Sequence, residues 1–410
     1  MLIVVLAIAG CLLVVRSAAI FGFSRLLVTY SLTTGNIEAV RKATQLTPND
    51  PEAHLAAAAV MSSLTPNESV IELERAVALR PDDYELWSEL GLLRDQTGDS
   101  TAALSAFDEA IRRAPFYSQS RWNRGNVLLR NGQYEAAFND LNQAAQSNPD
   151  LIPNLIDLAW GISKNDVTLT EQLAQINTGK KRVAFARLLA RRGAAKDAVA
   201  EFRAAGNVPD AIKREVVEEL LTKGAFKEAF EIWKLDHGLA KVKSEEPSIY
   251  DGGFEGPLVF AEGGFSWRVP RDLKATSIAL DSSQPQSGAK DLRIEFAGNS
   301  NPASAPVSQI ILVEPSRRYK INFSSRSQDV VSGGLPLVVV IDASGDRNLL
   351  GKSAPLSKGT SDWQFSSFEF PSAPATTAVV LSLQRVGCAT SPCPIFGSIS
   401  LDSFSIEELK

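Results

Sequence analysis

The sequence predicts a multidomain chain of mixed α and β structure, with an N-terminal membrane helix, an α-solenoid of helix-turn-helix repeats and a C-terminal all-β domain. A run without charged residues, Leu2–Val15, lies at the start of the chain. Three prolines, Pro81, Pro115 and Pro149, then recur at intervals of 34 residues. From Ile249 onward, short alternating runs replace the helical spacing of apolar residues. Each observation predicts one of the three parts.

The N-terminal run is interpreted as an uncleaved membrane anchor within residues 1–32. A helix needs about 20 apolar residues to cross a bilayer, and the run reaches that length when it is extended past Arg16 to Phe23. Arg16 lies near one end of this span, where a long side chain can extend toward the interface. Two alternatives stay open. Ile8-Ala9-Gly10-Cys11 resembles a bacterial lipobox, in which Cys11 would become a lipidated N-terminus, and the other alternative is a buried first helix of the solenoid.

Residues 33–238 are predicted to form the solenoid, because large and small side chains recur at equal offsets in successive units. The unit that starts at Tyr84 contains Trp87, Leu90, Gly91, Gly98, Ala103, Phe107, Ala110 and Pro115. The unit that starts at Ser118 contains, at matching offsets, Gly125, Gly132, Ala137, Leu141, Ala144 and Pro149. The small residues let two helices approach closely, and proline ends the second helix because it has no N–H to donate. This pattern resembles the tetratricopeptide repeat, which implies a stack of helix pairs that binds a protein partner.

The same resemblance implies which side chains face the concave groove of the solenoid. The family places four positions of each first helix there, and in these two units they are Glu85, Ser88, Leu92, Asp95, Gln119, Trp122, Asn126 and Leu129. Asn126 matches a position with which some members hold a C-terminal carboxylate, but Trp122 stands where those members have lysine. Trp122 would either anchor an apolar side chain of the partner or pack against the next repeat.

Residues 239–250 are interpreted as a linker, and residues 251–410 as the β domain. Short alternating runs between Ser, Gly, Pro and Asp clusters predict a sandwich or a barrel. The runs are Leu292–Phe296, Ser308–Val313, Tyr319–Ser325, Leu337–Ile341, Phe365–Phe370, Ala378–Leu383 and Ile399–Ile406. The order of elements, with Gly253-Phe-Glu255 at the start and Leu401-Asp402 near the end, resembles the galactose-binding-like group, which includes many carbohydrate-binding modules. The resemblance implies an antiparallel β-sandwich of the jelly-roll type.

Two kinds of site follow from this second resemblance. Aromatic side chains of such modules stack on sugars while polar side chains bond the hydroxyls, so the candidate ligand-binding residues are Trp267, Arg268, Gln309, Arg326, Trp363 and Arg385. Members of the group often hold a structural calcium ion between the opening Glu and the closing Asp, here Glu255 and Asp402. The alternatives are that the tryptophans belong to the core, that the arginines cover a sheet face, and that the two carboxylates cap turns.

The C-terminal cysteines bear on the cellular compartment. Cys388 and Cys393 lie five residues apart in a proline-containing loop, with no histidine or second cysteine pair to complete a zinc site. They are predicted to form a disulfide, which indicates an oxidising compartment. The positive-inside rule favours the opposite orientation, because basic residues follow the apolar run at Arg16, Arg25, Arg41 and Lys42. The disulfide is given more weight, so we expect a single-pass protein of the bacterial inner membrane, with most of the chain in the periplasm.

Charge and motifs exclude two classes of function. The net charge is −5 and neither the helical nor the β part is basic, which argues against nucleic acid as a partner. The chain has only two histidines, His54 and His237, and no Gly-x-Ser-x-Gly or His-Glu-x-x-His motif. We therefore expect a protein that is not an enzyme.

The expected function is that of a membrane-anchored extracytoplasmic adaptor. Its solenoid would bind a protein partner, and its sandwich would bind a glycan, such as a polysaccharide undergoing assembly or export in bacteria. The alternative is a pure protein scaffold whose sandwich has only a structural role. A hydrolase would need two carboxylates that face each other across a cleft, and the sequence singles out no such pair.

Overall fold

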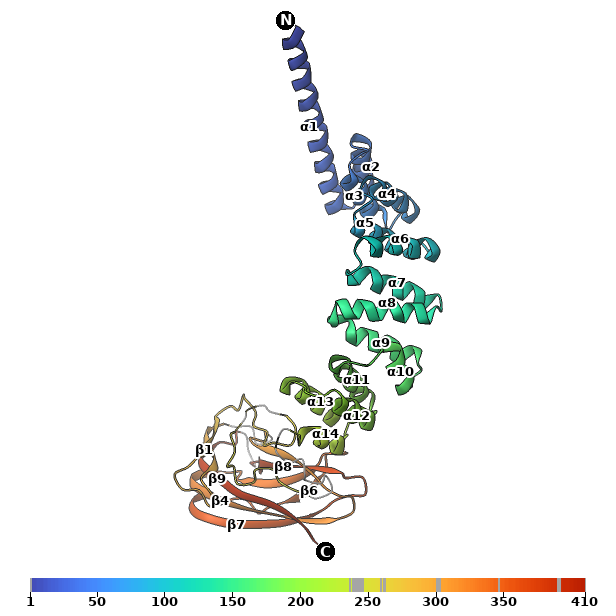
Figure 1. Ribbon diagram of the computed structural model, residues 1–410. Helices are drawn as coiled ribbons and strands as arrows, with labels where there is room; N and C mark the ends of the chain where they lie inside the picture. Colours follow the sequence, from blue (N-terminus) through green and yellow to red (C-terminus); the bar gives the residue numbers. More distant parts are fainter. Residues whose placement is uncertain are drawn as a thin grey trace. The chain divides into compact units, whose positions relative to one another are not determined.

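The computed structural model describes residues 2–235, 237, 247–258, 260, 263–299, 304–345, 347–388 and 392–409. Within these residues, 14 α-helices precede nine β-strands (Figure 1). The chain divides into two compact units, residues 1–176 and 177–410. This division lies inside the helical region, so the last four helices form one unit with the strands. Most of the predicted linker, residues 239–246, lies outside the described residues, and the predicted domain bounds stay a prediction.

The first unit is entirely helical. Its helices are α1 (Leu2–Thr34), α2 (Ile37–Leu46), α3 (Pro51–Met61), α4 (Pro66–Leu79), α5 (Tyr84–Gln96), α6 (Ser100–Arg113), α7 (Ser118–Arg130), α8 (Tyr134–Ser147), a 3₁₀ turn (Pro149–Leu151), α9 (Ile152–Ile162) and α10 (Val167–Ala174). The second unit begins with α11 (Gly179–Arg192), α12 (Ala195–Ala204), α13 (Asp210–Thr222) and α14 (Phe226–Trp233). The α-solenoid is therefore confirmed as the architecture of the helical region.

The first helix is longer than the predicted span. Its N-terminal part exposes apolar side chains, whereas Ser24, Val28 and Ser31 are buried. Val28 packs with residues of α2 and α3, and the Ser24 hydroxyl donates to the carbonyl of Ala43 at 3.3 Å. The C-terminal third of α1 thus acts as the first helix of a repeat, which is the role that one of the alternatives gave to the whole segment. Among the described residues, Leu6–Thr34 is the one segment that is long and apolar enough to cross a membrane, and a signal sequence meets the same description.

The helix pairs form as the residue offsets predict. Asp83 and Asp99 cap α5 and α6, with side chains that accept hydrogen bonds from the first-turn N–H groups of Glu85 and Ala102. Gly98 separates the two helices at a φ of +86°, a conformation that favours glycine. The close approach of the pair requires Gly91, because a Cβ there would lie 2.7 Å from the ring of Phe107. Gly125 has the same relation to Leu141 in the next pair, at 2.8 Å.

The second unit contains a sandwich of two antiparallel sheets. Its strands are β1 (Thr276–Asp281), β2 (Asp291–Gly298), β3 (Ser308–Leu312), β4 (Arg318–Ser332), β5 (Pro336–Asp342), β6 (Leu349–Lys352), β7 (Gly359–Pro371), β8 (Ala378–Arg385) and β9 (Ile395–Leu409). One sheet has the order β1-β2-β9-β4-β7, and the other has the order β3-β8-β5-β6. Six of the seven predicted runs lie within strands, the run Ser308–Val313 extends one residue beyond β3, and β1 and β6 were not predicted. The sandwich, rather than the barrel, is thereby confirmed.

One core fills the space between the two sheets. It includes Ile294, Tyr319, Phe323, Val340 and Leu401, all of them buried. Side chains of a strand alternate between its two faces, so the residues between these core positions lie on the outer faces of the sheets. The core therefore decides which polar residues can meet a ligand.

The predicted disulfide is present between Cys388 and Cys393, whose Cα atoms lie 5.5 Å apart. It closes the loop between β8 and β9. Arg385 at the end of β8 donates hydrogen bonds to the carbonyls of Gly334 and Cys393, so its guanidinium ties this loop to the turn before β5. Burial lowers the pKa of Arg385 from its ordinary value.

Candidate functional site

The strand registers assemble a polar surface on the outer face of the five-stranded sheet. Because Leu292, Ile294 and Phe296 of β2 point into the core, the residues between them point outward. Antiparallel pairing then aligns outward residues in rows across the sheet. The rows contain Asp281, Asp291, Asp402, Ser324 and Phe365, then Ala279, Arg293, Ser400 and Arg326, and then Ser277, Glu295, Ser398 and Gln328. We refer to these residues together with Trp363 as the outer face.

Two of the predicted ligand-binding residues meet on the outer face. The guanidinium of Arg326 lies over the ring of Trp363, at 5.2 Å from the ring centroid. Gln284, in the loop between β1 and β2, accepts a hydrogen bond from Arg326 at 2.5 Å and another from the indole of Trp363 at 3.0 Å. Both side chains are half-buried, so each keeps part of its surface open to a ligand.

The most exposed aromatic side chain of the β domain lies next to this pair. Phe365 is two positions from Trp363 on β7 and is 72% exposed. Val331 and Phe396, which pair across β4 and β9, extend the apolar part of the same face. The spacing of residues predicts that Phe365 lies in a strand but not that it faces solvent, because alternation alone does not say which side of a strand is the core.

The carboxylates of the outer face are engaged inside the domain. Asp281 lies 3.6 Å from the guanidinium of Arg293, and the backbone and hydroxyl of Ser283 hold the pKa of Asp281 below its ordinary value. Asp402 accepts hydrogen bonds from the N–H groups of Gln286 and Ser287. Both carboxylates therefore have partners within the domain.

Asp291 differs from these two carboxylates because its solvent exposure is 0% and neither oxygen has a hydrogen-bond partner of normal geometry among the described residues. Burial raises its pKa, and the neighbouring Ser400 offsets part of the rise. A buried carboxylate that must ionise without partners opposes folding.

Replacing Asp291 by asparagine is therefore expected to stabilise the β domain by about 1–2 kcal/mol at neutral pH. A pKa raised in the folded state favours folding at low pH, and this contribution is lost as the pH rises through the folded-state value. The stability gained by D291N should consequently vanish near pH 3, below the ordinary aspartate pKa of about 3.9, and should grow toward neutral pH. Urea unfolding of both proteins across this pH range measures the difference.

Asp281→Asn is the matched control, with the opposite trend. A pKa lowered in the folded state favours folding above the unfolded-state value, and this contribution is lost as the pH falls through the folded-state pKa. D281N should lose stability at neutral pH and match the parent chain in acid. A D291N variant that is less stable than the parent at neutral pH would show that Asp291 is well solvated or paired.

Three of the predicted ligand-binding residues have structural roles instead. Trp267 is only 6% exposed, packs on Phe254 and Phe404, and donates its indole N–H to the carbonyl of Asp251 at 2.9 Å. Gln309 is buried and exchanges two hydrogen bonds with the backbone of Tyr250. Arg385 is buried behind the disulfide loop. Their polar atoms are satisfied within the fold, so the structure places none of the three on a surface where sugar can stack.

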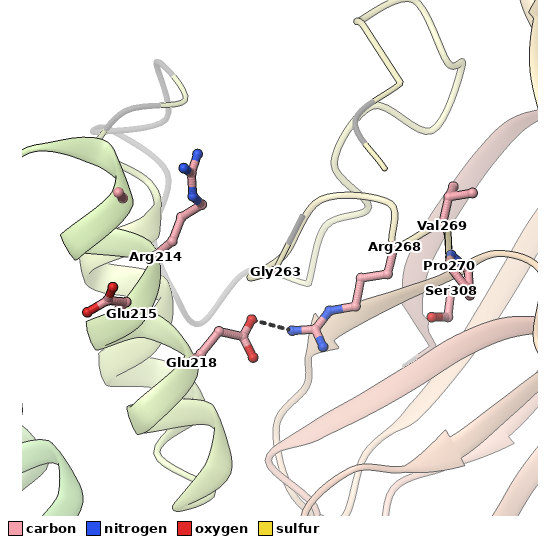
Figure 2. Close-up of a pocket in the computed structure, with 9 residues that line it drawn as sticks. Arg214, Glu215, Glu218, Gly263, Arg268, Val269, Pro270 and Ser308 are labelled. Atoms are coloured by element: carbon pink, nitrogen blue, oxygen red, sulfur yellow. Dashed lines mark hydrogen bonds and ion pairs between the residues drawn. The ribbon is translucent and has the colours of Figure 1, made fainter. Parts of the chain in front are cut away.

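Arg268 lies at the contact between the β domain and α13. Its guanidinium lies 3.2 Å from the carboxylate of Glu218 (Figure 2). The same carboxylate oxygen accepts a hydrogen bond from the N–H of Gly264. A cavity of about 730 Å³ surrounds this pair, and its lining includes Arg214, Glu215 and Ser308. Arg268 thus fixes the β domain to the last helices.

The outer face of the four-stranded sheet turns toward the same helix. Ile310, Val380 and Gln384 line a second cavity of about 420 Å³ together with Glu218 and Leu221 of α13. This sheet face is therefore partly taken up by the helical repeats, which leaves the five-stranded sheet as the better candidate for ligand binding.

Glu255 and Asp402 cap turns in this structure. Glu255 accepts a hydrogen bond from the N–H of Ala289 at 2.8 Å, and Asp402 accepts from Gln286 and Ser287 at 3.0 and 2.9 Å. Both carboxylates are thus engaged by backbone N–H groups, and the predicted calcium ion stays a prediction. Among the described residues, no group of three or more His, Cys, Asp or Glu side chains is placed to hold a metal ion.

The predicted groove residues of the solenoid are placed in three ways. Ser88 is buried, and its hydroxyl lies 3.1 Å from that of Ser120 on the next first helix, so it joins two repeats and is closed to a partner. Asp95 forms an ion pair with Arg130 of the next repeat at 2.5 Å. Glu85 is exposed, and Trp122 and Asn126 are half-buried, so these three side chains keep surface for a partner.

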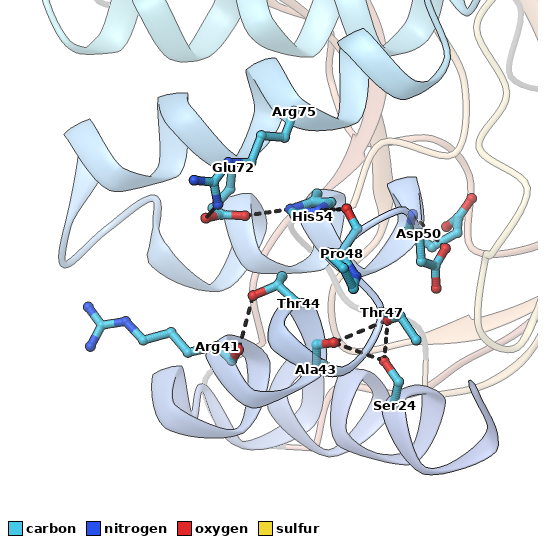
Figure 3. Close-up of polar contacts among 11 residues, drawn as sticks. Ser24, Arg41, Ala43, Thr44, Thr47, Pro48, Asp50, His54, Glu72 and Arg75 are labelled. Atoms are coloured by element: carbon cyan, nitrogen blue, oxygen red, sulfur yellow. Dashed lines mark hydrogen bonds and ion pairs between the residues drawn. The ribbon is translucent and has the colours of Figure 1, made fainter. Parts of the chain in front are cut away.

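The buried histidine of the helical region is part of a polar cluster rather than a catalytic site. His54 lies between Glu72, at 2.6 Å from Nδ1, and the carbonyl of Pro48, at 2.9 Å from Nε2 (Figure 3). Both ring nitrogens are therefore engaged within the fold. In the same view, the Ser24 and Thr47 hydroxyls meet at 2.8 Å, so polar contacts join α1 through α4.

Comparison with known proteins supports the helical part of this description. A family model of the tetratricopeptide repeat matches residues 72–118 and 89–152. Protein FlbA of Caulobacter vibrioides is 33% identical over 101 residues, which are 24% of this chain and 17% of FlbA. This chain therefore spans less than a fifth of the length of that relative.

Among solved structures, MamA of Desulfovibrio magneticus RS-1 is similar at 15% identity and a TM-score of 0.34, over 38% of this chain and 93% of MamA. A structure described as "CBM4 structure and function" is similar at 14% identity and a TM-score of 0.30, over 39% of this chain and 99% of that one.

Proposed function

We propose that the chain is a membrane-anchored adaptor. The premise is that residues 72–152 are tetratricopeptide repeats and so form a scaffold for protein interactions. Its repeats bind a protein partner, and the outer face of its five-stranded sheet binds a glycan. The proposal places the bulk of the chain outside the bacterial inner membrane, in the periplasm. The disulfide Cys388–Cys393 and the apolar first helix support this placement.

One observation carries the glycan part of the proposal. Arg326 and Trp363 meet on a sheet face where Phe365 lies two positions along the same strand as Trp363. Gln328, Arg293 and Glu295 also point outward on this face. An exposed aromatic ring beside hydrogen-bonding groups is the arrangement that binds the apolar face of a sugar while its hydroxyls are bonded. The arrangement supports binding rather than turnover, since the carboxylates on this face are paired, hydrogen-bonded or buried.

The test is to measure polysaccharide binding by the full chain in detergent, by retardation in gels that contain soluble polysaccharides. Phe365→Ala is expected to weaken binding about tenfold, because a stacked ring contributes on the order of 1.5 kcal/mol beyond the area that it buries. Trp363→Ala should weaken binding at least as much, since it also releases Arg326.

Phe116→Ala is the matched control, because Phe116 is an aromatic residue that is 87% exposed but lies in the helical repeats. It should leave the retardation unchanged. If no polysaccharide retards the folded parent chain, the glycan proposal is wrong and the scaffold with a structural sandwich replaces it.

A further inference from the structure

We propose that the glycan bound on the outer face is acidic, and that Arg326 binds its carboxylate. This inference rests on the proposed function and names the class of ligand for the same site. It follows from the pairing of charges on the outer face.

Arg326 has more N–H donors than its contact with Gln284 uses. A guanidinium carries five N–H donors, and one of them is directed to Gln284 at 2.5 Å. No carboxylate of the described residues lies within ion-pair distance of Arg326. Its positive charge nevertheless favours the ionised form of Asp281 and of Asp291. Arg293, its neighbour across the same row, is in contrast held by both Asp281 and Glu295.

The position of Arg326 is set before any ligand arrives. Its guanidinium lies over the Trp363 ring, and Gln284 holds both side chains from the loop above them. A guanidinium held flat in this way loses little freedom on binding and presents its remaining donors as a fork, which matches the two oxygens of a carboxylate.

The acidic residues of the outer face have their partners away from Arg326. Asp281 and Glu295 share the guanidinium of Arg293, and Asp402 accepts hydrogen bonds from N–H groups of the β1–β2 loop. Asp291 is out of reach of solvent. Arg326 is consequently the outer-face cation that remains for a ligand, next to the exposed ring of Phe365 on the neighbouring strand.

This juxtaposition fits a uronic acid residue. Its ring can stack on Phe365 while its carboxylate pairs with Arg326, so one sugar unit would satisfy the apolar and the charged part of the site together. A neutral sugar would satisfy only the apolar part.

The experiment compares polygalacturonate, alginate and hyaluronan with their carboxyl-reduced forms, which keep the backbone but lose the charge. Binding by the full chain in detergent is measured by gel retardation and by titration calorimetry. We expect binding of at least one acidic polymer and at least tenfold weaker binding of its reduced form, since hydrogen bonds to charged groups contribute that much.

Arg326→Ala should weaken binding of the acidic polymer by the same factor and leave binding of the reduced polymer unchanged. Arg326→Lys should restore part of it, because the charge returns without the planar fork. Arg318→Ala is the matched control, since Arg318 is an exposed arginine of the same strand that pairs with Glu369 outside the outer face.

Equal binding of the acidic and reduced polymers, or an R326A variant as tight as the parent, would overturn the inference and leave the glycan proposal standing. Absence of binding to the acidic, reduced and other neutral polysaccharides would overturn both. Circular dichroism of R326A establishes that the fold is kept.

Discussion

Replacing Arg124 by methionine is expected to lower the free energy of unfolding of the helical repeats by about 3–5 kcal/mol. Arg124 on α7 donates from Nε and Nη2 to the two oxygens of Asp140 on α8, at 2.5 and 2.6 Å. Asp140 is only 1% exposed, and the hydrogen bonds between the two groups raise the pKa of Arg124 above its ordinary value. The variant leaves a buried carboxylate without its bidentate partner, and Arg121 at 3.8 Å is too distant to replace it.

The measurement is urea unfolding followed by the helical signal in circular dichroism. The double variant R124M/D140N should recover much of the loss, because the remaining buried group is then uncharged. Arg112→Met is the matched control, since Arg112 pairs with Glu109 on the surface, and it should cost less than about 1 kcal/mol. An R124M variant within 1 kcal/mol of the parent would show that Asp140 does not depend on Arg124 as its partner.

Replacing Trp233 by alanine is expected to cost about 3–5 kcal/mol and to destabilise helices and sandwich together. Trp233 at the end of α14 is 6% exposed and contacts rings on both sides of the predicted linker. Its centroid lies 5.7 Å from Phe230 on the same helix, 5.0 Å from Tyr250 at the end of the predicted linker and 5.6 Å from Phe265 at the start of the β domain. Removing the indole empties the space that these rings share.

Calorimetry of the full chain distinguishes a joint effect from a local one. Trp87→Ala is the matched control, because Trp87 belongs to the first unit and should shift only the transition of that unit. Trp233→Phe should cost much less than Trp233→Ala, since the indole N–H has no partner among the described residues and the ring is retained. If W233A shifts a helical transition alone, the sandwich is stable without its contact to α14.

Much of the helical region could be predicted from the sequence because its signals are local. The 34-residue interval of the prolines, Gly98 at a turn and Gly91 opposite Phe107 each reflect contacts within one repeat. The disulfide was predictable for the same reason, since five residues of chain keep Cys388 close to Cys393. The extent of α1 was not, because an apolar run does not show where a helix leaves a membrane and begins to pack on Val40 and Ala43.

The candidate site could be predicted only in part. Arg326 and Trp363 were named and do meet, but Trp267, Gln309 and Arg385 were named with them and are buried. A tryptophan in a strand looks the same in the sequence whether it faces core or solvent, because alternation defines two faces without identifying them. Phe365 was missed for that reason.

The sequence by itself determined the kinds of structure present, namely an apolar first helix, repeated helix pairs and a chain of short strands, since each depends on spacing over a few tens of residues. Only the tertiary structure decided that residues as distant as Asp281, Arg293 and Arg326 share one surface. Their neighbourhood arises from the order and register of strands in the sheet, which depend on packing across the whole sandwich. Among the described residues, the same packing leaves Arg326 without an ion-pair partner and buries Asp291 without a hydrogen-bond partner of normal geometry.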